Sequence, residues 1–271
     1  MASWEFPTDG PIDLEIRLPA GNITIIAEPT PAATVTLLPQ RPGSKRDEEA
    51  ADRARVDFRN GRLFVIAPER PWLRGSAALD LTVLVPSESA CTVVTASADI
   101  RCTGHLGGLK ARTASGDLDV DVINGPVVVS TASGAVRLRD AAGPLRVHSA
   151  SGEVAAERAG DEATVQTASG HVRIENACAS VRARTASGDV RIGAISTGRG
   201  EIATVSGDIG VGIPAGVGVY LDLSAVSGQV RSELEPSEAG GDADLTLQCR
   251  TVTGDVLVSR TAAALGIIPG A

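Results

Sequence analysis

The chain has 271 residues, a length that fits one large domain or two ordinary ones. Aromatic residues make up only 2% of it, although hydrophobic residues make up 43%, which excludes a conventional aromatic-rich core and favours a narrow all-β interior. The formal net charge of -8 argues against a protein that binds the phosphate backbone of nucleic acids.

The first third of the chain, residues 1–88, reads as short strands without a repeat. Alternating apolar residues predict strands at Ile12–Leu18, Asn22–Ala27, Thr34–Leu38, Arg62–Ile66 and Leu79–Val85. Pro19-Ala20-Gly21-Asn22 resembles a hairpin turn between the first two strands. Ser44 and Asp47 have the pattern of an N-cap and a first-turn acid, which predicts one short helix near 44–54. We expect this segment to form a β-rich cap on the part that follows.

A repeat built on Thr-Ala-Ser-Gly occupies most of the remaining chain. Its copies end at Ala98, Gly116, Gly134, Gly152, Gly170, Gly188, Gly207, Gly228 and Gly254. The first five steps are each 18 residues, and the later ones are 19, 21 and 26. Each unit contains two segments of period-two alternation separated by turns. The repeat therefore predicts a single-stranded parallel β-solenoid (β-helix) over residues 89–260, with 18-residue coils, about eight or nine in number, and a tail or cap at 261–271.

Stacking of such coils places residues 18 apart above one another. The motif threonines and serines would then form two ladders, which parity along the strand predicts to point inward. The first ladder comprises Thr113, Thr131, Ser149, Thr167 and Thr185, and the second comprises Ser115, Ser133, Ser151, Ser169 and Ser187. Because the serine recurs in nearly every coil, we interpret it as structural and not as a catalytic nucleophile.

The residue after each motif glycine forms a third column, rich in acids. It comprises Asp99, Asp117, Ala135, Glu153, His171, Asp189, Asp208, Gln229 and Asp255. A calcium site, or a metal site at His171 between Glu153 and Asp189, is a hypothesis that this column leaves open. The alternative is that these acids accept backbone hydrogen bonds in the turn. We assign no catalytic, cofactor-binding or metal-binding residue and expect no cofactor.

Basic residues occupy outward positions of the predicted strands. Those before the motifs are Lys110, Arg112, Arg146, Arg182 and Arg184, and those after them are Arg137, Arg173 and Arg191. They could form stripes along a regular face, although a solvated surface is the simpler interpretation.

The pattern as a whole is similar to a known bacterial family. A Trp-containing N-terminal β segment, the pair Val85-Pro86 and the repeated (Thr/Ser)-(Ala/Val)-Ser-Gly units resemble the domain-of-unknown-function family called "putative adhesin" or β-strand repeat-containing, of the actinobacterial type. The resemblance covers nearly the whole chain. It implies a repetitive β architecture and surface display, and it implies no catalytic residues.

Location and redox state can be predicted from the termini and the cysteines. The N-terminal residues lack the basic and apolar regions of a secretory signal, and no run is long and apolar enough for a membrane helix. Cys91, Cys102, Cys178 and Cys249 form no Cys-x-x-Cys pair. Scattered free thiols favour a reducing compartment, so the chain is expected to be cytoplasmic.

The leading hypothesis for function is a non-enzymatic scaffold or interaction protein. Its partner would be another protein or a second copy, bound through the faces or ends of the solenoid, and self-assembly is one form of this hypothesis. Eight extra residues near Glu233–Asp242 predict an acidic loop that is either a tolerated insertion or a recognition element. The alternatives are a ligand- or envelope-binding (adhesin-like or stress-sensing) module and, more remotely, a carbohydrate-active β-helix enzyme.

Overall fold

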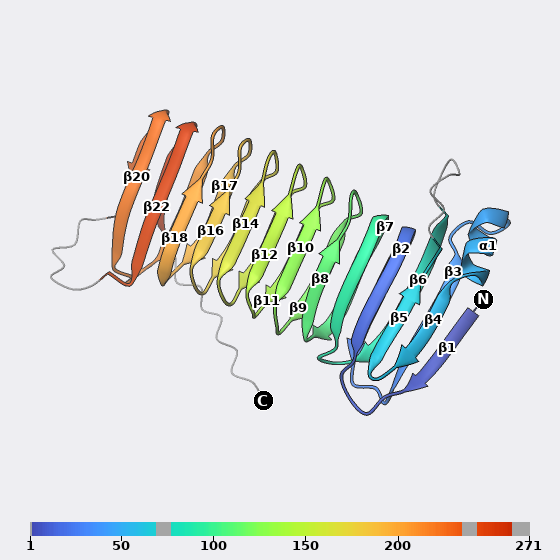
Figure 1. The fold of residues 1–271 in the computed structure, drawn as a ribbon. Helices are drawn as coiled ribbons and strands as arrows, with labels where there is room; N and C mark the ends of the chain where they lie inside the picture. The colour runs from blue at the N-terminus through green and yellow to red at the C-terminus, as the bar shows by residue number, and fades with distance from the viewer. Residues whose placement is uncertain (1, 69–76, 235–242, 262–271) are drawn as a thin grey trace.

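The chain winds into a parallel β-solenoid, as the repeat predicts. The computed structural model describes residues 2–68, 77–234 and 243–261. Two sheets run along the molecule and meet at the motif corner (Figure 1). We call the sheet formed by the segments before each Thr-Ala-Ser-Gly the pre-motif sheet, and the sheet formed by the segments after it the post-motif sheet.

The central coils follow the 18-residue period strand by strand. Val127 pairs with both Leu109 and Leu145, each 18 residues away, and Val136 pairs with Leu118 and Val154. The pre-motif strands of these coils are β8 (Gly108–Arg112), β10 (Val127–Thr131), β12 (Leu145–Ser149), β14 (Ala163–Thr167), β16 (Val181–Arg184) and β18 (Gly198–Ala203). The post-motif strands are β9 (Leu118–Ile123), β11 (Val136–Ala141), β13 (Val154–Ala159), β15 (Val172–Ala177), β17 (Val190–Ile195) and β19 (Ile209–Pro214).

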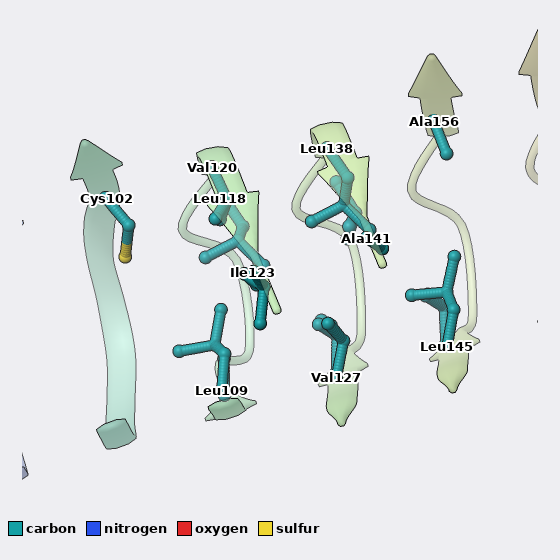
Figure 2. Close-up of a cluster of buried hydrophobic side chains, with 14 of the residues drawn as sticks. Cys102, Leu109, Leu118, Val120, Ile123, Val127, Leu138, Ala141, Leu145 and Ala156 are labelled. Carbon is teal, nitrogen blue, oxygen red and sulfur yellow. The ribbon is translucent and has the colours of Figure 1, made fainter. Parts of the chain in front are cut away.

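The interior is a narrow column of aliphatic side chains. Leu109, Val127 and Leu145 project from one sheet toward Leu118 and Leu138 of the other (Figure 2). All of these side chains are at most 3% exposed. Because each strand buries every second residue, the core needs β-branched and small aliphatic residues, which explains the scarcity of aromatic residues.

The N-terminal third adds further layers to both sheets. Its strands are β1 (Ala2–Pro7), β2 (Asp13–Glu28), β3 (Ala32–Pro39), β4 (Arg55–Arg59), β5 (Arg62–Ile66) and β6 (Ala78–Pro86), and the next strand is β7 (Ala90–Leu106). β2 lies between β7 on one side and β5 and β6 on the other. The antiparallel pairs β4–β5, β3–β6 and β1–β3 close this end. Whether residues 1–88 and 89–260 behave as separate units stays a prediction.

The hairpin expected at Pro19–Asn22 is wrong. β2 is one continuous strand that turns the corner from the pre-motif sheet to the post-motif sheet. Gly21 adopts a φ of 120° there, and a Cβ atom on it would lie 1.9 Å from the carbonyl oxygen of Leu79. The Pro-Ala-Gly-Asn signal therefore marks a solenoid corner, because a corner also needs glycine where one backbone approaches another.

The only helix in the described residues, α1, covers part of this end of the molecule. It runs from Lys45 to Asp52, and the Ser44 side chain accepts a hydrogen bond from the Asp47 backbone N–H at its start. The Asp47 carboxylate is fully buried, pairs with the Arg41 guanidinium at 2.8 Å and accepts the Ala78 backbone N–H at 3.1 Å. Asp47 thus connects the helix to β6. This helix is not long and apolar enough to cross a membrane.

The last coils are stacked out of sequence order. The remaining strands are β20 (Val219–Ser227), β21 (Val230–Ser232), β22 (Leu245–Thr253) and β23 (Val256–Thr261). β18 pairs with β22, and β22 pairs in turn with β20, so the third coil in the chain fills the second place (Figure 1). The expectation that the coils follow the chain is wrong at this end. Most of the predicted loop at Glu233–Asp242, and the tail from residue 262, lie outside the described residues.

Three of the four free cysteines are interior residues, which makes thiol reactivity a test of the core. Burial raises the pKa of the Cys91 and Cys249 thiols to about 12 and holds that of Cys102 well above its ordinary value. The reactive form is the thiolate, so these three thiols stay protonated and shielded. Exposed Cys178 is expected to react alone with Ellman's reagent under native conditions, and all four in denaturant. Four fast thiols in the native protein would contradict this packing.

Candidate interaction surfaces

The motif corner is held by the threonine. Thr131 is buried, and its Oγ1 accepts the Gly134 backbone N–H at 2.9 Å. The same bond occurs in the neighbouring coils, at Thr113–Gly116, Ser149–Gly152 and Thr167–Gly170. The predicted inward threonine column is therefore confirmed, although these hydroxyls accept within their own coil. In the last coils Thr185, Thr204 and Thr251 also donate to a glycine carbonyl of the coil before.

The predicted inward serine ladder is wrong. Ser133 is exposed, and so is Ala132 before it. β10 ends at Thr131, so the two residues after it form the corner and the alternation starts again beyond Gly134. The parity argument fails because it assumed that the strand continues through the motif. The serines instead line an exposed ridge.

These two assignments predict opposite results for two conservative substitutions. Thr131→Val keeps the shape of the side chain but removes the acceptor of a buried N–H, and should lower the free energy of unfolding by about 1–3 kcal/mol. Ser133→Ala should change it by less than about 0.5 kcal/mol. Urea unfolding of both variants gives the comparison. Equal losses would mean that the serine is also a structural group.

The acid column is used by the backbone. The Asp117 carboxylate accepts the Ala135 N–H at 2.9 Å, and the Asp208 carboxylate accepts the Asp255 N–H at 2.8 Å. His171 takes the same role, because its Nδ1 accepts the Asp189 N–H at 3.0 Å. Each of these groups satisfies a donor of the next coil. In the described parts of the chain, no three His, Cys, Asp or Glu side chains converge as a metal site would require.

Charges on the two sheets are arranged differently. On the post-motif sheet, arginines alternate with acids: Arg158 pairs with Asp140 at 2.8 Å, and Arg139 lies 3.7 Å from Asp121. On the pre-motif sheet, Arg182 and Arg184 share Glu201 at 2.8 and 3.9 Å. By contrast Lys110, Arg112 and Arg146 form no ion pair with any described residue. We call these three cations, with His148, the basic patch.

A groove opens at the β4 end of the molecule. It has a volume of about 900 Å³. Its apolar lining includes Trp4, Val56, Phe64 and Ile66, and its cationic lining comprises Arg55, Arg59 and Arg62. Sequence reasoning placed the aromatic residues in a cap but missed this groove, because the pairing of β4 with β5 is what brings the arginines to the aromatic rings.

The opposite end of the molecule is open. All six large hydrophobic side chains that are well exposed in the described residues lie in the last three coils: Val205, Tyr220, Val226, Val230, Val252 and Leu257. Tyr220 and Val226 belong to β20, the outermost strand, and are 64% and 82% exposed. The sequence signal for this end was present in the motif, where valine replaces alanine in these coils.

The two ends differ in how their edge strands are protected. At the N-terminal end the Phe6 and Phe58 rings pack with centroids 5.6 Å apart, and α1 contacts β3 and β6. Its edge strands carry Pro7 on β1 and Arg55 and Arg59 on β4, residues that disfavour pairing with another strand. On β20 the single charged residue is Asp222, which accepts hydrogen bonds from Gln248 and Arg250 of β22.

Comparisons with known proteins agree with this architecture. Residues 12–259 match the family model described as Toastrack DUF4097. A "putative lipid binding protein" from Parabacteroides distasonis has 14% identity and a TM-score of 0.55, with 96% of each chain covered. A "putative adhesin" from Parabacteroides merdae has 13% identity and a TM-score of 0.50, with 96% of this chain and 95% of that chain covered.

Identities this low establish a common fold and nothing more. No curated protein matches the chain. The family match, in contrast, covers far more than half of the sequence and includes both sheets and the motif coils. The chain therefore belongs to the Toastrack DUF4097 family, a family of unknown function whose resemblance to "putative adhesin" proteins the repeat already indicated.

Proposed function

We propose that this chain is a non-enzymatic interaction protein that associates with a second copy through the open end of its solenoid. The observation that supports this proposal is the contrast between the two ends. One end is closed by antiparallel strands, a helix and charged edges. The other ends in a nine-residue strand, β20, with a free edge and exposed apolar side chains.

A second copy fits this edge because strand pairing is self-complementary. Two β20 strands related by a two-fold axis run antiparallel, so each would offer the other its unpaired N–H and C=O groups. The pairing would join two pre-motif sheets into one. It would also cover Tyr220 and the half-buried inner residues Leu221 and Leu223, which face the end of the core.

Sedimentation velocity of the full chain over a range of micromolar concentrations tests this proposal. The expected result is a reversible dimer, abolished by the double substitution Tyr220→Lys/Val226→Lys on β20. The matched control is Val205→Lys/Val252→Lys, which adds the same charge at exposed valines on inner coils and should leave the dimer intact. A monomer at every concentration, or a dimer that both doubles weaken equally, would reject end-to-end association.

A ligand-binding module is the second candidate, and the groove at β4 is the observation that favours it. Apolar rings beside arginines suit a small amphipathic anion. The resemblance to a "putative lipid binding protein" supports the same direction. Trp4 and Trp72 are the two tryptophans, so Trp72→Phe leaves Trp4 as the only one. Saturable change of its emission with dodecanoate is expected, and weaker binding after Arg55→Gln/Arg59→Gln. Unchanged emission would exclude this ligand from the groove.

The cytoplasmic location predicted from the sequence is retained as part of the proposal. Buried free thiols at three of the four cysteines support it, since disulfides are not part of the fold described here. Fractionation of the native host with an antibody against the chain measures it. Recovery with exported proteins would contradict it.

A further inference from the structure

The pre-motif sheet carries a compact set of cations that no described residue neutralises. By register, Lys110 lies beside Val128, which lies beside Arg146, while Arg112 lies beside Ser130, which lies beside His148. Neighbouring strands are about 4.8 Å apart, and alternate residues of a strand about 7 Å apart. The basic patch therefore forms a rectangle of roughly 10 by 7 Å. Uncharged Val128 and Ser130 fill its middle.

Acidic residues are sparse around this rectangle. The outward residues of the flanking strands are Thr92 and Val94 on β7 and Thr164 and Gln166 on β14. The nearest acid along the face is Glu162, at the border of β14. Cations usually acquire a neighbouring acid when they have only a solvated role on a sheet, as the arginines of the post-motif sheet do. The unpaired arrangement suits a partner that supplies the negative charge.

The chain is acidic overall, so its positive face gives it a direction. Between Ala90 and Ser187 the acids of the coils lie almost entirely on the post-motif sheet and its corners. A negatively charged partner would be repelled by that sheet and attracted by the basic patch. Only one orientation of approach is then favourable.

We propose that the basic patch docks the protein on an anionic lipid bilayer. A bilayer is planar and has mobile headgroups, so a flat rigid sheet can present all its cations to it at once. Single-stranded nucleic acid would need aromatic side chains for base stacking, and β8, β10 and β12 contain none. This docking is independent of self-association, because the patch lies on the central coils and shares no residue with β20.

Co-sedimentation of the full chain with vesicles tests the docking. Binding is expected to phosphatidylglycerol-containing vesicles and not to pure phosphatidylcholine vesicles, and it should weaken as salt is raised. The triple substitution Lys110→Gln/Arg112→Gln/Arg146→Gln should weaken binding about 100-fold, at about fivefold for each cation removed. The matched control, Arg137→Gln/Arg139→Gln/Arg173→Gln, lowers the net charge equally on the other sheet and should leave binding within about twofold of the wild type.

Three outcomes would overturn the proposal. They are no binding of the wild type to the anionic vesicles, equal losses in the two triple variants, or patch-dependent binding of soluble polyphosphate without binding of vesicles. Circular dichroism of each variant confirms that the comparison is made on folded protein. The patch variant should keep the sedimentation behaviour of the wild type, so failure of the docking and failure of self-association give different results.

Discussion

Replacing Gly134 with alanine is expected to lower the free energy of unfolding by about 3 kcal/mol or more. The added Cβ atom would lie 2.0 Å from the carbonyl oxygen of Gly116 in the coil before it, far inside van der Waals contact. That oxygen belongs to the backbone of a stacked coil, so neither side can move away without breaking inter-coil pairing. The clash, and not the backbone angle, is the cause, because Gly134 has no positive φ. Urea unfolding followed by circular dichroism measures the loss.

Gly210→Ala is the matched control for this prediction. Gly210 also lies in a coil, on β19, but the nearest atom to its added Cβ is the Arg191 Cγ at 3.9 Å. Alanine there should leave stability unchanged or raise it by up to about 1 kcal/mol, because it restricts the unfolded chain. Similar losses at Gly134 and Gly210 would contradict the close stacking of the motif corners.

Asp47→Ala is expected to have the second large effect, a loss of about 3 kcal/mol. The substitution removes a buried carboxylate that accepts the Ala78 N–H and two hydrogen bonds from Arg41. The Ala78 N–H is then left buried without its acceptor, and α1 loses its bond to β6. Thermal unfolding compared with Glu49→Ala, an exposed acid of the same helix, separates this effect from a change in helix charge. A loss no larger than that of the control would show that α1 is not attached through Asp47.

The same carboxylate predicts a dependence on pH. The hydrogen bond from the Arg41 guanidinium lowers the pKa of Asp47 below its ordinary value, against the opposing effect of burial. Since the folded-state pKa is lower than that of the unfolded chain, the stabilisation is fully present above about pH 4 and is lost as the pH falls through the folded-state pKa. The stability difference between wild type and Asp47→Ala should therefore shrink in acid. A constant difference from neutral pH down to acid would contradict this assignment.

The repeat predicts the solenoid because its period and the stacking register are the same physical quantity. Val127 lies beside Leu145 for the reason that both are 18 residues apart in units of equal shape. The serine ladder was mispredicted because parity is a property of a strand, and the strand ends at Thr131. The structural use of the acid column was predictable as an alternative, since a carboxylate beside a turn accepts backbone N–H groups.

The interaction surfaces were only partly predictable. Lys110, Arg112 and Arg146 could be placed on an outward face from alternation alone. Their lack of acidic neighbours depends on which coils are adjacent, which the register shows. The open end was not predictable, because spacing along the chain cannot tell that residues 245–261 return to lie inside residues 219–232. The groove at β4 likewise depends on long-range antiparallel pairing.

The order of the last coils is the central claim, because it makes β20 the free edge. Ala203 pairs with Arg250, and Arg250 pairs with Ser224. In a Cys178→Ser background, Ala203→Cys/Arg250→Cys should therefore form an intramolecular disulfide, detected by mass spectrometry of the linked peptides, since paired Cα atoms lie within disulfide reach. Ala203→Cys/Ser224→Cys should not, because two strand spacings separate its cysteines. The reverse result, with residue 203 linked to 224 and not to 250, would contradict the structure of this end and the self-association proposed from it.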